Sequence, residues 1–183
     1  TNSLAKDISS LLKLLIKKEF NLNCYIFSSK KRNSRYLAVN NVSLFNSLVK
    51  LGFPVGKKGN IIIPKKILSL EWKIKKYLIR GLFDTDGCIS ARKHEGYRYP
   101  YLIITSKSLP LIQQISSLLR ERNYPVYIRK RGDEVILRGN KNLNKWMSEI
   151  GSSNQRHLIK YKYWLKHGKL PTKFNWRGLL SSG

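Results

Sequence analysis

An internal repeat constrains the fold of this chain more than any other feature of its sequence. The pentapeptide ISSLL occurs at residues 8–12 and again at 115–119, and each copy lies in a stretch with the apolar spacing of an amphipathic helix. Each stretch is followed by alternating apolar and polar residues around a polar turn, at 24–39 and at 126–139, which predicts a β-hairpin. The chain should therefore contain two copies of one structural pattern.

The agreement between the two copies continues past the hairpins. A second helix is predicted at 41–53 in the first copy and at 140–152 in the second. These helices end at Gly52 and Gly151, the residue type expected just beyond a helix C-terminus. Agreement over three consecutive elements indicates a true structural repeat.

The second copy has a front half that the first copy lacks. Its elements are a helix at 71–85, a strand at 88–93, a turn at His94–Gly96 and a strand at 97–105. A complete unit therefore has the order αββαββα, and we expect an α+β fold. The expected parts are a partial first unit at 1–56, a linker at 57–70, a complete unit at 71–168 and a basic tail at 169–183.

The charge of the chain points to a polyanionic partner. It has 36 basic and 10 acidic residues, a formal net charge of +26, spread along the whole sequence. Nucleic acid is the first candidate. No stretch approaches the roughly 18 apolar residues of a membrane span, and the N-terminus lacks a signal-peptide pattern, so we expect an intracellular, cytoplasmic or organellar protein that is not secreted. Cys24 and Cys88 lie far apart and predict neither a disulfide nor a zinc site.

Two acidic residues stand at the end of the helix predicted for 71–85. Asp84 and Asp86 lie at its C-terminal pole, where the helix dipole disfavours anions by about 0.3–1 kcal/mol. A hard cation would explain them, because Mg²⁺ prefers carboxylate and water oxygens. If a second such helix packs beside this one, two carboxylates converge, which is an arrangement suited to phosphodiester hydrolysis.

The faces of the same helix suggest how it packs. We expect Ile74, Leu78 and Leu82, at four-residue spacing, to face the core. A second face with little bulk runs through Gly81 and Thr85 and allows another helix to approach closely. Gly87 is expected in the left-handed conformation that ends a helix.

Two other interpretations of the acidic pair were weighed. Asp84 alone fits a surface position on a helix. A calcium loop of EF-hand type would place Asp84, Asp86 and Glu95 at positions 1, 3 and 12. That loop is excluded because its fifth and sixth positions, Cys88 and Ile89, lack the oxygen ligand and the glycine that it requires.

The nonapeptide IRGLFDTDG at 79–87 resembles the motif of the LAGLIDADG homing endonucleases, with five identities at Gly81, Leu82, Asp84, Asp86 and Gly87. The resemblance implies a saddle-shaped antiparallel sheet and an intron- or intein-encoded nuclease that hydrolyses double-stranded DNA with Mg²⁺ or Mn²⁺.

The resemblance also implies roles for individual residues. Asp86 and Gly87 would form the metal site, with Asp86 catalytic, and Asp84 would support the helix interface together with Gly81 and Thr85. Lys107, just after the second strand, is the nearest match to a basic residue beside the scissile phosphate.

The departure from the family pattern concerns the second acid. Family members carry one motif and form homodimers, or carry two motifs in one chain, whereas this chain has one motif and about one and a half units. The second motif helix would come from a homodimer partner or from a missing N-terminal segment. The second source is favoured, because a sheet without its first two strands exposes an unpaired edge.

The sheet would lie in the major groove of DNA, which admits β-ribbons. Candidate DNA-binding residues, taken from the alternation along the strands, are Lys30, Lys31, Arg32, Arg35, Arg92, Arg98, Arg129, Lys130, Arg131 and Arg138. The alternative function is a nucleic-acid-binding protein of the same fold that does not cleave, such as an intron RNA maturase or a regulator.

Overall fold

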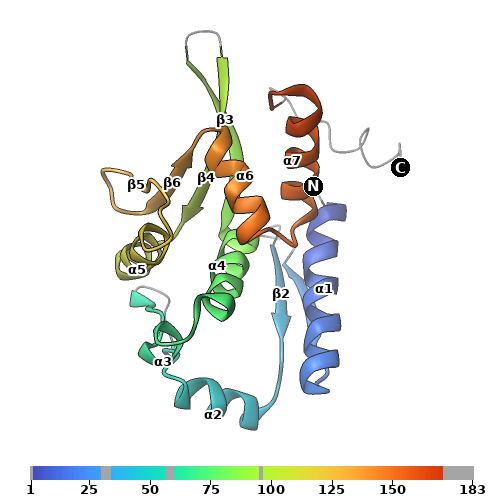
Figure 1. The fold of residues 1–183 in the computed structure, drawn as a ribbon. Helices are drawn as coiled ribbons and strands as arrows, with labels where there is room; N and C mark the ends of the chain where they lie inside the picture. Colours follow the sequence, from blue (N-terminus) through green and yellow to red (C-terminus); the bar gives the residue numbers. More distant parts are fainter. Residues whose placement is uncertain (1, 30–33, 57–59, 95–96, 171–183) are drawn as a thin grey trace.

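The computed structural model describes residues 2–29, 34–56, 60–94 and 97–170 of the chain (Figure 1). Its elements are α1 (Asn2–Phe20), β1 (Tyr25–Ser29), β2 (Ser34–Ala38), α2 (Val42–Lys50), α3 (Lys65–Leu68), α4 (Trp72–Asp86), β3 (Gly87–His94), β4 (Tyr97–Thr105), α5 (Leu109–Arg120), β5 (Tyr127–Ile128), β6 (Glu134–Arg138), α6 (Asn140–Glu149) and α7 (Gln155–His167). From α4 to α6 the order is αββαββα. The predicted α+β class and element order are confirmed.

The second unit is built on an antiparallel sheet with the strand order β3-β4-β6-β5. In β4, Leu102 and Ile104 point into the core, and their partners in β6 are Leu137 and Val135, which are also buried. Helices α4, α5 and α6 contribute further large apolar side chains to the same core. Figure 1 shows these helices packed beside the sheet while the β3–β4 hairpin extends beyond it.

Helix α4 packs on a different face from the one that the sequence predicts. Ile79 and Phe83 are fully buried, whereas Ile74, expected in the core, has 46% of its surface exposed. Leu78 and Leu82 are only partly buried. The chain passes directly from α4 into β3, so the face that ends on Phe83 is the one that the sheet covers. Four-residue spacing in the sequence does not indicate which of the two apolar faces of α4 packs against the sheet.

Gly87 is required by close packing and not by a left-handed conformation. It begins β3 in an extended conformation, with φ −96° and ψ 170°, so the expectation for its backbone was wrong. A Cβ added at this position would lie 2.5 Å from the carbonyl oxygen of Phe83 and 2.9 Å from its Cα. Only a residue without a side chain lets the strand start against the last turn of α4.

The first 56 residues contain a helix, a two-stranded antiparallel hairpin and a second helix, which is also the order from α5 to α6. Gly52 and Gly151 follow the second helix of each copy with φ of +95° and +75°. The two stretches differ in packing, because α2 has no buried residue. The proposed division of the chain into units at 1–56 and 71–168 stays a prediction.

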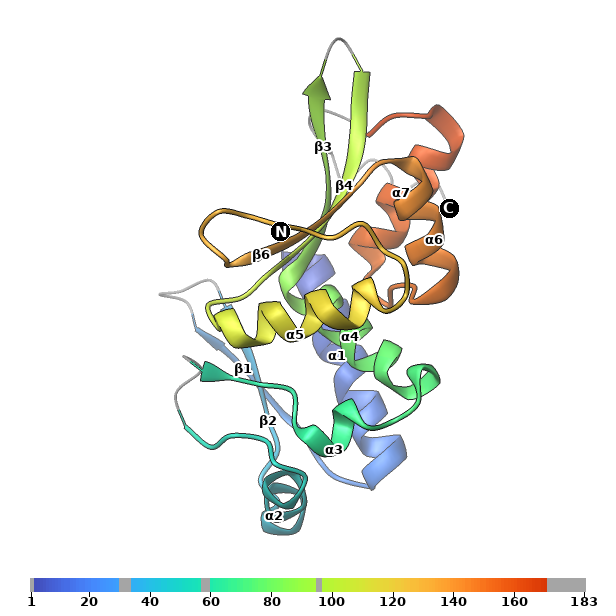
Figure 2. The ribbon, with the colours of Figure 1, turned by 60° about the vertical axis from the view of Figure 1, so that its left-hand side comes forward.

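The described part of the expected linker packs against α5 (Figure 2). The amide of Ile63 donates to Gln114 Oε1 at 2.7 Å, and Gln114 Nε2 donates to the carbonyl of Ile63 at 3.2 Å. The hydroxyl of Ser108 donates to the carbonyl of Ile61 at 2.5 Å. Ile63 is buried in the core and Ile61 packs against it, so these two residues belong to the second unit's core. Of the expected tail, residues 171–183 lie outside the described part.

Within the described ranges, no helix is long and apolar enough to cross a lipid bilayer. Cys24 and Cys88 are both free thiols.

The two motif glycines provide a first test. Replacing Gly87 with Ala should lower the free energy of unfolding by about 2 kcal/mol, because the added methyl group overlaps Phe83. Replacing Gly81 with Ala should raise it by up to about 1 kcal/mol, because the added methyl meets nothing within 4 Å and alanine favours the helix. Urea unfolding measures both values. Equal effects of the two substitutions would contradict this packing.

Candidate active site

The two acids of the motif occupy opposite environments at the end of α4. Asp84 is buried and Asp86 is exposed. Residues two positions apart on an α-helix point about 200° away from each other, so both carboxylates cannot share one face. The two acids therefore have different partners and different roles.

Asp84 joins the end of α4 to the connection between α6 and α7. Its carboxylate accepts hydrogen bonds from the hydroxyl of Ser152, from the amide of Ser153 at 2.8 Å and from the amide of Asn154 at 3.4 Å. The side chain of Asn154 also donates to the backbone carbonyl of Asp84 at 2.8 Å. We call these contacts the Asp84 clamp. Asp84 also lines a hollow between α1 and α4, so its expected role at a helix interface stays a prediction.

Asn154 extends the clamp into the last helix. Its side-chain oxygen accepts from the amide of Arg156 at 3.0 Å and so caps the N-terminus of α7. His157 lies on the other side, with Nδ1 3.1 Å from the hydroxyl of Ser152 and 3.8 Å from Asp84 Oδ1. The ring of His157 packs on Phe83 at a centroid distance of 4.3 Å. One carboxylate thus fixes α4, the α6–α7 connection and α7 together.

The clamp sets the ionisation of Asp84. Burial by itself would raise the pKa of this carboxyl group. The hydrogen bonds from His157 and Ser152 and from the amides of Ser153 and Asn154 outweigh burial and hold the pKa below its ordinary value of 3.8. Asp84 is therefore an anion at neutral pH, and its charge stabilises the fold.

Asp86 lies at the exposed end of α4. Its Oδ2 is 3.2 Å from the hydroxyl of Thr85, which also lies 3.1 Å from the carbonyl oxygen of Gly81. Within the described residues, no group of three or more His, Cys, Asp or Glu side chains lies close enough to hold a metal ion. One accessible carboxylate nevertheless suits Mg²⁺, which usually takes one or two carboxylates and completes its shell with water and phosphate oxygens. Asp86 fits such an ion as a single protein ligand.

Lys107 lies at the same end of the sheet as Asp86. Gly87 pairs with Ile104 across the β3–β4 ladder, and Lys107 follows three residues later in the connection to α5. Its side chain is exposed. The fold therefore brings a cation and an accessible carboxylate to the same end of the sheet, although they are separated by 21 positions in the sequence.

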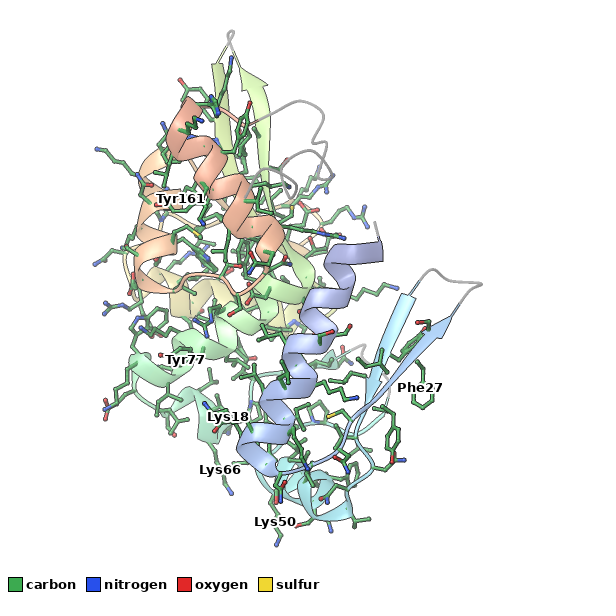
Figure 3. The ribbon with its side chains drawn as sticks, turned by 90° about the vertical axis from the view of Figure 1, so that its right-hand side faces the viewer. Lys18, Phe27, Lys50, Lys66, Tyr77 and Tyr161 are labelled. Atoms are coloured by element: carbon green, nitrogen blue, oxygen red, sulfur yellow. The ribbon has the colours of Figure 1, made fainter. Side chains whose placement is uncertain are left out.

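The face of α4 that carries Gly81 and Thr85 borders a hollow of about 180 Å³. Figure 3 shows α1 beside α4, which carries the labelled Tyr77. The opposite wall is formed by Leu11, Leu12 and Leu15 of α1. A Cβ at Gly81 would meet nothing within 4 Å. The expected close helix contact at Gly81 is absent from the described part of the chain, and the small-residue face stays open.

The sheet face that points away from the core combines aromatic and basic side chains. Tyr101 pairs with Arg138 across the β4–β6 ladder, and the guanidinium of Arg138 lies 4.3 Å from the centroid of the Tyr127 ring and 5.8 Å from that of Tyr101. Tyr99 is exposed further along β4. Stacked guanidinium and phenol groups with exposed edges suit contact with nucleic acid.

The other predicted DNA-binding residues have varied surroundings. Arg129 and Arg131 are exposed but form ion pairs with Glu134 at 2.8 Å and Asp133 at 3.3 Å, while Lys130 is exposed at the turn between them. Arg92 and Arg98 lie in β3 and β4 and Arg35 in β2, but their side chains are outside the described part. Lys30, Lys31 and Arg32 lie outside the described residues altogether.

Sequence reasoning missed Lys160. Its ammonium group donates to the carbonyl of Ile89 at 2.6 Å and so ties α7 to β3 beside the motif. Burial lowers the pKa of Lys160, and Cys88 and Arg156 act on it in opposite directions. Lys160 is one of several basic residues in an amphipathic helix, so the sequence does not indicate that this lysine in particular makes the contact. The clamp residue Asn154 was detectable, since an asparagine before a helical pattern indicates an N-cap.

Comparison with known proteins agrees with this geometry. Residues 73–160 match a family model described as a LAGLIDADG-like domain. No curated protein matches the chain. The matched range begins in α4 and ends in α7, and it contains the Asp84 clamp, Asp86 and Lys107.

The clamp predicts a pH-dependent loss of stability on substitution. Asp84→Asn should lower the free energy of unfolding at pH 7 by about 2 kcal/mol, because charge-assisted hydrogen bonds to the α6–α7 connection are lost. The pKa of Asp84 is lower in the folded state than in the unfolded state. The contribution of Asp84 to the free energy of unfolding is therefore complete at a pH above the unfolded-state pKa, and it is lost as the pH falls through the folded-state pKa. The difference between the variant and the original chain should therefore shrink in acid.

Urea unfolding at a series of pH values between neutral and strongly acidic measures this difference. Asp86→Asn is the matched control, because Asp86 is exposed and its replacement should change the free energy of unfolding by no more than about 0.5 kcal/mol. A difference for Asp84→Asn that is constant with pH would contradict the assignment of the effect to the carboxylate charge.

Proposed function

Since the chain belongs through residues 73–160 to the LAGLIDADG family of homing endonucleases and maturases, we propose that it is a site-specific DNA endonuclease that hydrolyses phosphodiester bonds with a divalent metal ion. The observation that carries the proposal is the exposed carboxylate of Asp86 at the end of α4, at the same end of the sheet as the connection with Lys107.

The different environments of the two acids support a role in DNA cleavage. Asp84 has a structural role, whereas Asp86 is exposed at a helix pole that disfavours anions. In a chain with a net charge of +26, an exposed acid beside a nucleic-acid surface opposes binding unless a cation accompanies it. A protein that only binds nucleic acid gains nothing from such a carboxylate.

Asp86 would hold Mg²⁺ or Mn²⁺ together with Gly87. When bound, the ion supplies positive charge that stabilises the attacking and leaving oxygens of the phosphodiester. Thr85 positions the Asp86 carboxylate through their 3.2 Å contact. The clamp on Asp84 keeps the end of α4, and with it Asp86, in a constant place relative to the sheet.

Lys107 would act on the substrate phosphate. Its exposed side chain lies at the same end of the sheet as Asp86. There its ammonium group would balance the negative charge that develops on the phosphate oxygens during hydrolysis. The proposal therefore assigns binding of the metal to one side chain and stabilisation of the phosphate to another.

The outer face of the sheet would bind double-stranded DNA. Arg138 is held between Tyr101 and Tyr127, so its guanidinium is oriented before DNA arrives. Such ordering reduces the conformational entropy lost on binding. Arg129 and Arg131 contribute positive charge near the same face, moderated by their acidic partners.

The catalytic assignment predicts that Asp86→Asn abolishes strand cleavage. The affinity for DNA should stay within about twofold of the original chain, and the free energy of unfolding within about 0.5 kcal/mol. Duplexes enriched from a random pool by binding to the chain serve as substrates, with Mg²⁺ or EDTA present. A variant that loses binding as well would contradict the assignment.

Lys107→Met serves as a second variant in the same assay and should slow cleavage by a factor of about 100, in line with the loss of one charge-stabilising group. A maturase would differ from an endonuclease in the same experiment. It would prefer structured RNA over the enriched duplexes in competition and would cleave neither with Mg²⁺.

The binding face predicts a change in salt dependence. Arg138→Gln should weaken DNA binding about tenfold or more and reduce the slope of log K against log salt by about one unit if Arg138 meets a phosphate. Lys73→Gln is the matched control, because Lys73 lies at the start of α4 and pairs with Glu71 at 2.9 Å. Equal losses for both variants would mean that binding responds to net charge and not to this face.

A further inference from the structure

Helix α7 carries positive charge that the proposed DNA-binding face of the sheet does not use. The helix contains Arg156, Lys160, Lys162 and Lys166 and no acidic residue. The sequence has no acidic residue anywhere from 150 to 170. Positive charges gathered on one short helix repel one another, and a polyanion bound beside them removes that repulsion.

The packing of α7 separates its basic side chains into two groups. His157 and Trp164 are buried, with 3% and 7% of their surface exposed, and Lys160 on the same face reaches β3. Lys162 and Lys166 each lie two positions after a residue of that packed face, so they point about 200° away from it. Both of these lysines are exposed. They therefore face away from the core.

No acidic side chain of the described residues pairs with Lys162 or Lys166. The lysine and arginine side chains that do form ion pairs there are those of Lys18, Lys73, Arg122, Arg129 and Arg131. The exposed side of α7 thus presents positive charge without a counter-charge of its own.

Helix α6 and the end of α7 extend this basic surface. The hydroxyl of Tyr161 donates to Asn144 Oδ1 at 3.1 Å, so α7 lies along the Asn144 side of α6. Lys141 is exposed and lies three residues before Asn144, which places it on the same side of α6. Lys169 is exposed just beyond α7. We call Lys141, Lys162, Lys166 and Lys169 the α7 surface.

The α7 surface and the outer face of the sheet point away from the core in different directions. Phe83 packs on His157 of α7 inside the core, and Leu137 closes the same core from the sheet. Arg138, next to Leu137 in β6, points out on the other side of the sheet. Figures 1 and 2 show α7 on the opposite side of the second unit from the β5–β6 hairpin, and Figure 3 shows it on the outside of the protein. A short duplex on the sheet therefore leaves the α7 surface accessible.

We infer that the α7 surface binds the phosphate backbone of a second DNA duplex, so that one chain holds two duplexes at once. The charge of the surface is complementary to a polyanion. Lysine ammonium groups are compact point charges that suit phosphate oxygens, and such contacts do not read the base sequence. The second duplex is therefore bound without regard to its sequence.

The aromatic rings of α7 favour a duplex over an unpaired strand. Tyr161 stacks on Trp164 with ring centroids 6.1 Å apart, and Tyr163 contacts His167 at 4.2 Å. Proteins that bind unpaired strands offer aromatic rings on which the bases stack. Because the rings of α7 contact one another, a duplex, whose bases are already stacked together, is the better partner.

The inference goes beyond the proposed cleavage, because neither Asp86 nor Lys107 takes part and no metal ion is needed. Binding is measured in EDTA, so failure to hold a second duplex and failure to cleave are separate results.

Co-capture of two duplexes tests the inference. One short duplex is fixed to beads through biotin, and a second, fluorescent duplex of unrelated sequence is free in solution with the chain. The original chain should carry the fluorescent duplex to the beads. A double variant with Lys162→Gln and Lys166→Gln should lower this capture about tenfold or more, and it should reduce the slope of log K against log salt for the second duplex by about two units. Binding of the first duplex should change by no more than about twofold.

A double variant with Lys13→Gln and Lys17→Gln is the matched control. These two lysines are also exposed and also four residues apart on one helix, but they lie on α1. The control should keep the capture of the fluorescent duplex. Equal losses in the two double variants would overturn the inference, because binding would then respond to net charge alone. Capture that survives the α7 substitutions would overturn it as well.

The same assay distinguishes other occupants and other ways of joining two duplexes. Light scattering should find one chain for each pair of duplexes, and two chains would mean that a dimer joins them. A structured RNA should displace the fluorescent duplex no better than an unlabelled DNA duplex does. Displacement by RNA at concentrations more than tenfold lower would mean that the α7 surface binds RNA, which contradicts the inference.

Discussion

The hydrogen bonds that Asp84 accepts from Ser152, Ser153 and Asn154 are the interaction on which the rest of the second unit depends. They join the last turn of α4 to the start of α7, two places about 70 positions apart in the chain. The buried carboxylate keeps its charge because polar hydrogens surround it, and its pKa falls below the ordinary value in spite of burial. A carboxylate left without these donors at a negative helix pole would destabilise the same turn.

The clamp also explains how two acids in one short motif serve different purposes. The helical repeat turns Asp84 inward and Asp86 outward, and Gly87 then lets the strand begin immediately against Phe83. Because the inward acid fixes the end of the helix, the outward acid occupies a constant position at the same end of the sheet as the connection that carries Lys107. The proposed chemistry therefore depends on a residue that does not take part in it.

The repeat shows that the same sequence pattern can form a helix without being buried in a core. ISSLL forms a helix in both copies, since helix formation follows from local spacing and capping. Burial requires a complementary surface, and only α5 has one, from α4, β4 and the 60–64 segment. The leucines of α1 stay exposed because no comparable surface covers them within the described part of the chain.

The sequence by itself determined the elements of the αββαββα order, the basic character and the motif with Asp84 and Asp86, because these depend on periodicity, composition and residue type. The tertiary structure alone decided which face of α4 is buried, that Asp84 is structural, that Gly87 is extended and that Lys160 reaches Ile89. These features arise from contacts between residues far apart in the chain, and local spacing contains no information about the partner that a side chain will meet.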